Sequence, residues 1–351
     1  MGRGFWVVAA CALLGLVLGV ADAAAKTVLL VSGPTANAAS GMLTIELRGA
    51  AADDAWGTIT TYVPNGYTIN LGYQTGTRIG SVAAGVQLLE TRANARVAGA
   101  VLVADPNDPA VQNAAAACTH APAHAAAWLV RLTVSTRAVD AYAYVDPTSG
   151  GEQSFGSAKL VLCLPQPYSS VLPSYAPLGT KISDLTLTLS AGIFRNPLLG
   201  GTNLWRSVVT PWVADGAALD PAAATESQAL VALPASFQLQ AKVTASRRRR
   251  SSVLLSGKVL ENLAGVAGAR ISFFANDTSA GGASTGALGT FALRRRLTGR
   301  TAYTATATVP TRATACVAQL PASFAPAGCV SATRAGYRLR SNSVVVTPRR
   351  R

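Results

Sequence analysis

Short segments in which apolar and polar residues alternate occur throughout the chain. Clear examples are 43–48, 184–189, 253–259 and 303–309. In the first, leucine and isoleucine take the odd positions, while threonine, glutamate and arginine take the even ones. On a β-strand a two-residue period sends one row of side chains into a core and the other into water. We therefore expect an all-β protein.

Further short segments fit the same interpretation and are separated by Pro- and Gly-containing turns. They are 58–63, 82–89, 128–135, 141–145, 159–164, 204–210, 271–273 and 291–293. No convincing amphipathic helix accompanies them. The pattern predicts an N-terminal β-sandwich domain followed by a C-terminal β-sandwich. The N-terminal part fits either one sandwich or two small ones.

The charge of the chain changes sharply along its length. Residues 26–240 carry 11 Lys/Arg and 13 Asp/Glu, a net of −2, whereas residues 241–351 carry 18 and 2, a net of +16. The Pro- and Ala-rich stretch 220–234 lies just before this change. We therefore place a domain boundary near Ala235, with domains at 26–235 and 236–348 and a basic tail at 349–351.

The C-terminal part contains several glycine- and aromatic-bearing motifs in a definite order. They are Ser256-Gly257-Lys258-Val259, Gly265-Val266-Ala267-Gly268-Ala269, Gly289-Thr290-Phe291 and Tyr303-Thr304-Ala305. This order resembles that of bacterial Ig-like and carboxypeptidase-regulatory-like sandwich modules, over about residues 236–348. The resemblance implies a seven-stranded Ig-like sandwich used as a non-catalytic spacer or interaction module. The N-terminal part resembles exported bacterial β-domains of unassigned function only in a general way.

Residues 1–25 have the pattern of a cleavable secretory signal peptide. Arg3 precedes an uncharged apolar run at 5–20, and small residues at 21–25 offer cleavage sites. The run is shorter than the ~20 residues that a spanning helix needs. An uncleaved anchor, or lipidation at Cys11, is the alternative. We expect a mature chain without a transmembrane helix, located outside the cell or at its surface.

The four cysteines left after removal of the leader fit an oxidising compartment. They are Cys118, Cys163, Cys316 and Cys329. Four cysteines allow three pairings, and the domain boundary favours Cys118–Cys163 and Cys316–Cys329. Free buried thiols are the alternative.

Both histidines of the chain, His120 and His124, follow Cys118 closely. A thiolate and two imidazoles suit zinc or copper, but we favour a Pro/Ala-rich loop tied down through Cys118, and predict no cofactor. Asp140 or Asp146 could orient one of these histidines in a Ser/His/Asp triad. The oxygen-rich stretch 105–109 is explained by turn chemistry as well as by calcium.

Other enzyme signals are scarce, because the sequence has no Gly-x-Ser-x-Gly elbow, no His-Glu-x-x-His pair and no phosphate-binding glycine loop. We therefore predict no enzymatic activity. Four tryptophans could form a platform for sugars, although an aromatic residue on an alternating strand is more often part of the core. They are Trp56, Trp128, Trp205 and Trp212.

Two arginine clusters of the C-terminal part are the best functional lead. They are Arg247, Arg248, Arg249 and Arg250, and Arg294, Arg295 and Arg296. Such a positive field attracts polyanions in a salt-dependent way. We predict a non-catalytic surface protein held to an anionic cell-envelope polymer, without sequence-specific nucleic-acid binding. Solvated charge alone would explain the clusters equally well. A secreted carbohydrate-binding or adhesion protein, or a secreted hydrolase, are the alternatives. The oligomeric state stays open.

Overall fold

The structure is a computed structural model that describes residues 27–33, 41–50, 53–89, 92–134, 137–167, 180–199, 201–213, 218–245, 251–314 and 332–348. Within these ranges strands dominate, with one α-helix, α1 (Pro109–Thr119), and two short 3-10 helices, η1 (Gly150–Ser154) and η2 (Pro221–Ala223). The all-β prediction is confirmed. None of the described helices has the length and apolar character to cross a membrane.

The first part of the chain forms one large sheet. Its strands run in the order β1-β2-β10-β5-β6-β7-β8-β9-β3-β12-β13-β22-β21. Neighbours are antiparallel except β13 and β22. The sheet curls so that β1 lies against β13 near its other end. The bounds are β1 (Thr27–Ser32), β2 (Leu43–Gly49), β3 (Trp56–Val63), β5 (Arg78–Leu88), β6 (Asn94–Ala104), β7 (Ala126–Val134), β8 (Arg137–Pro147), β9 (Ala158–Cys163), β10 (Thr180–Leu189), β12 (Gly201–Pro211), β13 (Thr225–Leu233), β21 (Arg312–Thr314) and β22 (Ala332–Arg334).

Curling lets this sheet enclose one large hydrophobic core between residues 29 and 233. A smaller cluster of buried residues lies where α1 packs on the sheet; it consists of Val111, Ala115, Ala127 and Tyr144. Strand register explains how the alternating segments build it, because Leu185 lies opposite Leu47 and Leu187 opposite Ile45. All four side chains are at least 96% buried, and each contributes on the order of 1.5–3 kcal/mol. Of the two arrangements left open for the N-terminal part, the large core supports one unit, because strands from β1 to β13 all contribute to it. A small pair, β4 (Thr68–Ile69) and β11 (Phe194–Arg195), adds to this unit.

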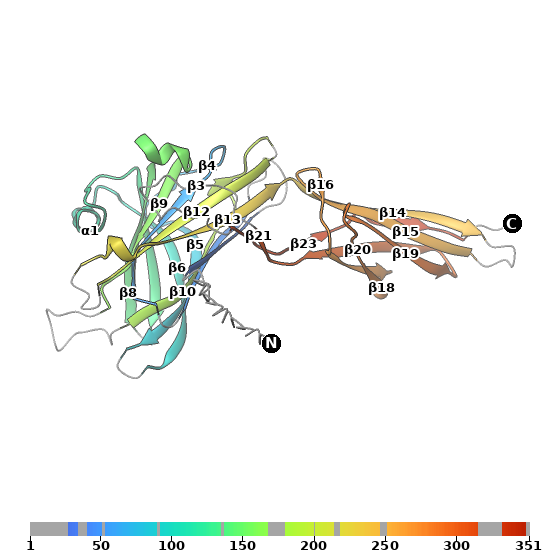
Figure 1. The fold of residues 1–351 in the computed structure, drawn as a ribbon, viewed down its shortest axis with the longest axis horizontal. Helices are drawn as coiled ribbons and strands as arrows, with labels where there is room; N and C mark the ends of the chain where they lie inside the picture. Colours follow the sequence, from blue (N-terminus) through green and yellow to red (C-terminus); the bar gives the residue numbers. More distant parts are fainter. Residues whose placement is uncertain are drawn as a thin grey trace, which may run out of the picture.

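The C-terminal strands form two facing layers around a second core. Figure 1 shows these layers extending away from the large sheet. One layer contains β14 (Ala235–Ala245), β15 (Ser251–Glu261), β16 (Ala264–Gly265) and β19 (Thr290–Leu297). The other contains β17 (Arg270–Ala275), β18 (Thr278–Ser284), β20 (Thr301–Val309), β23 (Tyr337–Arg340) and β24 (Val344–Val346).

The two cores lie on either side of residues 234–236, close to the expected boundary. The chain nevertheless passes between the two parts more than once. Strands β21 and β22, which the boundary at Ala235 assigns to the C-terminal domain, pair with each other and extend the large sheet from β13. The division at Ala235 itself stays a prediction.

Gly257 explains why the motifs of the C-terminal part contain both a glycine strand and a Gly-x-Phe hairpin. A Cβ atom at Gly257 would lie 2.0 Å from the Gln238 carbonyl oxygen and 2.6 Å from Cζ of Phe291. Phe291 is 5% exposed and packs edge-on against Phe237, with ring centroids 5.5 Å apart. The missing side chain at 257 therefore makes room for the Phe291 ring.

We expect Gly257→Ala to lower the free energy of unfolding by about 1–3 kcal/mol, because overpacking forces backbone or ring shifts. Chemical denaturation of the full chain measures this loss. Gly286→Ala, in the turn between β18 and β19, is the control, since the nearest atom to its added Cβ is 3.9 Å away. Equal effects of the two substitutions would contradict this role of Gly257.

Candidate functional site

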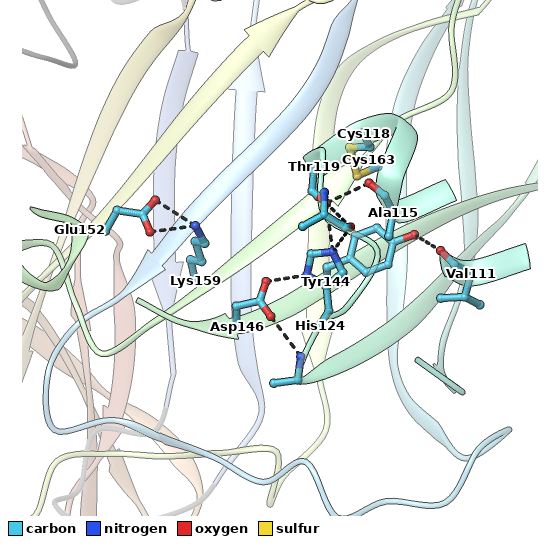
Figure 2. A network of polar contacts seen from close by, with 12 residues as sticks. Val111, Ala115, Cys118, Thr119, His124, Tyr144, Asp146, Glu152, Lys159 and Cys163 are labelled. Atoms are coloured by element: carbon cyan, nitrogen blue, oxygen red, sulfur yellow. Dashed lines mark hydrogen bonds and ion pairs between the residues drawn. A yellow bond between two sulfur atoms is a disulfide. The ribbon is translucent and has the colours of Figure 1, made fainter. Parts of the chain in front are cut away.

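The helix α1 is held at both ends by side chains that the sequence supplies locally. Asp108 caps its N-terminus, accepting a hydrogen bond from the Ala110 backbone N–H at 2.7 Å. The Cys118–Cys163 disulfide ties its last turn to β9, with Cα atoms 6.1 Å apart. The Tyr144 hydroxyl on β8 donates to the Val111 carbonyl at 3.0 Å. Figure 2 shows the disulfide and the contact between Tyr144 and Val111 at this helix.

This helix corrects part of the loop interpretation of residues 118–124. Cys118 lies in the last helical turn, and only from His120, which has a left-handed backbone with φ of 60°, does the chain leave the helix. The predicted disulfide between Cys118 and Cys163 is confirmed. Cys316 and Cys329 lie outside the described residues.

His124 is the centre of a polar network between α1 and β8 (Figure 2). Its Nδ1 donates to Asp146 Oδ2 at 2.6 Å, and its Nε2 lies 3.0 Å from Thr119 Oγ1 and 3.1 Å from the Ala121 carbonyl oxygen. The ring stacks on Tyr144 with centroids 4.4 Å apart, and the side chain is 5% exposed. Of the two carboxylates considered as partners of the histidines, Asp146 is the one in contact.

Thr119, His124 and Asp146 are connected in series by hydrogen bonds, as are the nucleophile, the general base and the carboxylate that orients the base in a catalytic triad. The Thr119 hydroxyl is, however, surrounded by acceptors within the protein, because it also lies 2.9 Å from the Ala115 carbonyl and 3.0 Å from that of Ala121. A nucleophile needs room for a reacting carbon. The contacts of Thr119 and His124 instead hold the C-terminal end of α1 against β8.

A metal site at these residues would need ligands that the structure uses otherwise. The sulfur of Cys118 is bonded to Cys163, and His124 Nδ1 faces Asp146. Within the described ranges, no group of three or more His, Cys, Asp or Glu side chains is placed to hold a metal ion. The stretch 105–109 is a turn in which Asp105 Oδ1 accepts from the Asn107 N–H at 2.9 Å and Asp108 caps α1.

Asp140, the other carboxylate considered as a histidine partner, pairs with Arg131. Two hydrogen bonds of 2.8 Å join the guanidinium to the carboxylate. The hydrogen bond from Arg131 holds the pKa of Asp140 below its usual range. Asp140 is therefore an ion-paired surface carboxylate.

A row of polar side chains that sequence reasoning missed crosses four strands of the large sheet. Strand register aligns Lys159, Tyr62, Arg206 and Gln228 on β9, β3, β12 and β13. Lys159 Nζ and the Tyr62 hydroxyl donate to Glu152 at 2.8 and 3.1 Å. Both the ammonium of Lys159 and the hydroxyl of Tyr62 thus bind the carboxylate of Glu152. The sequence carries no local signal for this row, because its polar residues come together only through the strand register.

At the other end of this row, Arg206 lies 4.7 Å above the centroid of the Phe155 ring. Burial lowers the pKa of Arg206 and raises that of Glu226, whose carboxylate accepts a hydrogen bond from Gln228 at 3.1 Å. Two carboxylates, Glu152 and Glu226, flank this row, as a glycosidase requires, but each is bound to side chains of the protein.

The tryptophans do not form a sugar platform. Trp56, Trp128 and Trp205 are at most 4% exposed and belong to the core of the large sheet, whereas Trp212 is half-buried. Trp205 packs edge-on against Tyr67 at 5.1 Å. The core interpretation of Trp128 is confirmed.

The second arginine cluster lies on β19, at the edge of the four-stranded layer. Arg294, Arg295 and Arg296 are all exposed. Register aligns Arg294 with Leu254 and Lys242, and Arg296 with Ser252, so both arginines extend from the outer face of the layer. The first cluster, Arg247 to Arg250, and the tail at 349–351 lie outside the described residues.

The opposite layer is also basic on its outer face. Arg270 and Arg338 lie on either side of Thr308, and Arg340 lies opposite Thr306. All three arginines are exposed. In these strands polar residues alternate with apolar ones, so the arginines lie in the row that faces away from the core.

The C-terminal part has too few carboxylates to neutralise this positive charge. Beyond residue 240 the sequence contains only Glu261 and Asp277. Glu261, 4% exposed, accepts hydrogen bonds from Arg334 and from the Tyr337 hydroxyl where the C-terminal layers meet β13. Burial and Glu261 raise the pKa of Tyr337. Asp277 lies in the turn between β17 and β18.

Comparisons with known proteins do not assign a family. No protein-family model matches the chain, and no curated protein matches it. Among solved structures, the D0-D1 domain of intimin is 9% identical, and the alignment covers 88% of this chain and 96% of that one, with a TM-score of 0.18. A putative membrane-anchored protein from Corynebacterium diphtheriae is 13% identical over 87% of this chain and 52% of its own, also with a TM-score of 0.18.

We expect His124→Ala to lower the free energy of unfolding by about 1–3 kcal/mol, because Asp146 Oδ2 loses its donor in a largely buried place. Thermal unfolding of the full chain measures the loss. His120→Asn is the control, since His120 is exposed and asparagine accepts a left-handed backbone. An unchanged melting temperature for His124→Ala would refute the structural role of the network.

Proposed function

We propose that this protein is an exported, non-catalytic interaction protein of the bacterial cell surface, held to an anionic envelope polymer by its basic C-terminal layers. The observation that carries the proposal is the uncompensated charge on both outer faces of these layers. One face carries Lys242, Lys258, Arg294 and Arg296, all of them exposed. The other face carries Arg270, Arg338 and Arg340, which are also exposed.

Physical chemistry supports binding of a polymer over binding of a small anion. Exposed cations spread over a rigid surface act together on a chain of negative charges, and their attraction weakens as salt rises. Individual surface cations contribute little by themselves. Few carboxylates of the protein neutralise these cations, since Glu261 already pairs with Arg334.

The N-terminal unit supports the non-catalytic part of the proposal. His124, the centre of the triad-like network, has both ring nitrogens occupied by protein groups. The Cys118–Cys163 disulfide supports export, because disulfides persist in oxidising compartments. The leader at 1–25, on which export chiefly depends, lies outside the described residues.

The alternatives receive less support. Sugar binding through the first part would need exposed aromatic rings, and Trp56, Trp128 and Trp205 are in the core. A hydrolase would need an accessible nucleophile, and the Thr119 hydroxyl is bound among backbone carbonyls.

We expect the full chain to bind immobilised wall teichoic acid at low ionic strength and to be released as salt rises. The triple substitution Arg294→Ser, Arg295→Ser, Arg296→Ser should weaken binding at least tenfold, because three unpaired cations are lost. Surface plasmon resonance at several salt concentrations measures both effects.

The matched control removes three exposed arginines from the large sheet, as Arg48→Ser, Arg96→Ser, Arg131→Ser. These side chains are 60%, 66% and 47% exposed, and each is paired with a carboxylate. The control variant should bind almost as wild type does. Equal losses in the two variants, or failure of the wild type at low salt to bind either wall teichoic acid or an acidic polysaccharide, would refute the proposal.

A further inference from the structure

The outer face of the four-stranded layer contains a groove of about 480 Å³ over β14, β15 and β19. Its polar lining consists of Ser236, Gln238, Gln240, Ser256, Lys258 and Thr290. Register places Gln238, Lys258 and Thr290 in one row and Gln240 beside Ser256 in the next. Two residues of strand separate these rows, so they lie about 7 Å apart.

The hydrogen-bonding groups of this groove are available to a ligand. Gln238, Gln240, Lys258 and Thr290 are exposed. Among the described residues, none of the six polar side chains that line the groove forms a hydrogen bond or an ion pair within the protein. Two amides, three hydroxyls and one ammonium group thus point to the same space without partners.

The backbone beneath the groove is rigid. Strand β15 is hydrogen-bonded to β14 on one side and to β19 on the other. The buried Phe291 ring lies under Gly257, where a side chain would collide with it. A site built on such strands presents its side chains at fixed spacing, and binding does not have to order the backbone.

The set of groups favours a carboxylated sugar over a phosphate. Phosphate sites use the planar fork of arginine, several cations together or backbone N–H groups at a helix N-terminus. This groove has a single cation, Lys258, among neutral groups. Amides and hydroxyls both donate and accept, so they match sugar hydroxyls, while the ammonium matches one carboxylate.

We propose that this groove binds a uronic-acid residue of an acidic polysaccharide. Lys258 Nζ pairs with the sugar carboxylate, and Gln238, Gln240 and Thr290 exchange hydrogen bonds with its hydroxyls. This inference rests on the proposed function. It specifies the class of polymer that binds at one of the two basic outer faces of the C-terminal layers.

The test uses the full chain and a polygalacturonic acid oligosaccharide at low salt, with affinity measured by isothermal titration calorimetry. We expect Lys258→Ala to weaken binding at least tenfold. Lys242→Ala is the matched control, since it removes the same charge from an exposed lysine of the same layer, and should weaken binding no more than about twofold. Ser256→Trp fills the groove without changing charge and should also weaken binding at least tenfold.

Circular dichroism and the melting temperature establish that each variant is folded. Equal losses of affinity for Lys258→Ala and Lys242→Ala would overturn the binding role of the groove but leave the proposed function intact. Binding of a polyphosphate chain by the wild type, without binding of the oligosaccharide, would overturn the sugar assignment alone. Failure to bind either polymer at low salt would refute both proposals.

Discussion

The two-faced β-strand is the constraint on which the rest of this structure depends. Within β15, Val253, Leu255 and Val259 are fully buried, while Lys258 on the alternate row is exposed. Burial of the inner row supplies the free energy that holds the layers together. The outer row is then free to carry charge, since its side chains remain in water and incur little desolvation cost.

The distribution of carboxylates decides what that charge can do. In the large sheet, surface arginines such as Arg131 have carboxylate partners, so their field is largely cancelled. In the C-terminal layers, Glu261 is used to hold Arg334 and Tyr337 beside β13. A buried carboxylate of this kind must keep its partners, because an unpaired charge in that place would be costly. The outer faces are left with cations only.

Several elements could be predicted because their signal is local. The alternating segments became strands, and Cys118 paired with Cys163 as expected. The helix α1 escaped prediction because its alanines have high helix propensity but contribute no amphipathic pattern, and only Val111 and Ala115 are buried. The row from Lys159 to Gln228 escaped for another reason, since its members meet only through the register of strands distant in sequence.

The amino-acid sequence by itself determined the strand content, the even number of cysteines after residue 25 and the excess of cations after residue 240, because these depend on composition and on neighbours two residues apart. Only the tertiary structure decided that β21 and β22 extend the large sheet, that His124 meets Asp146, and that Gln238, Lys258 and Thr290 share one row. Such contacts depend on which strands pair and in which register, and a two-residue period fits many pairings equally well.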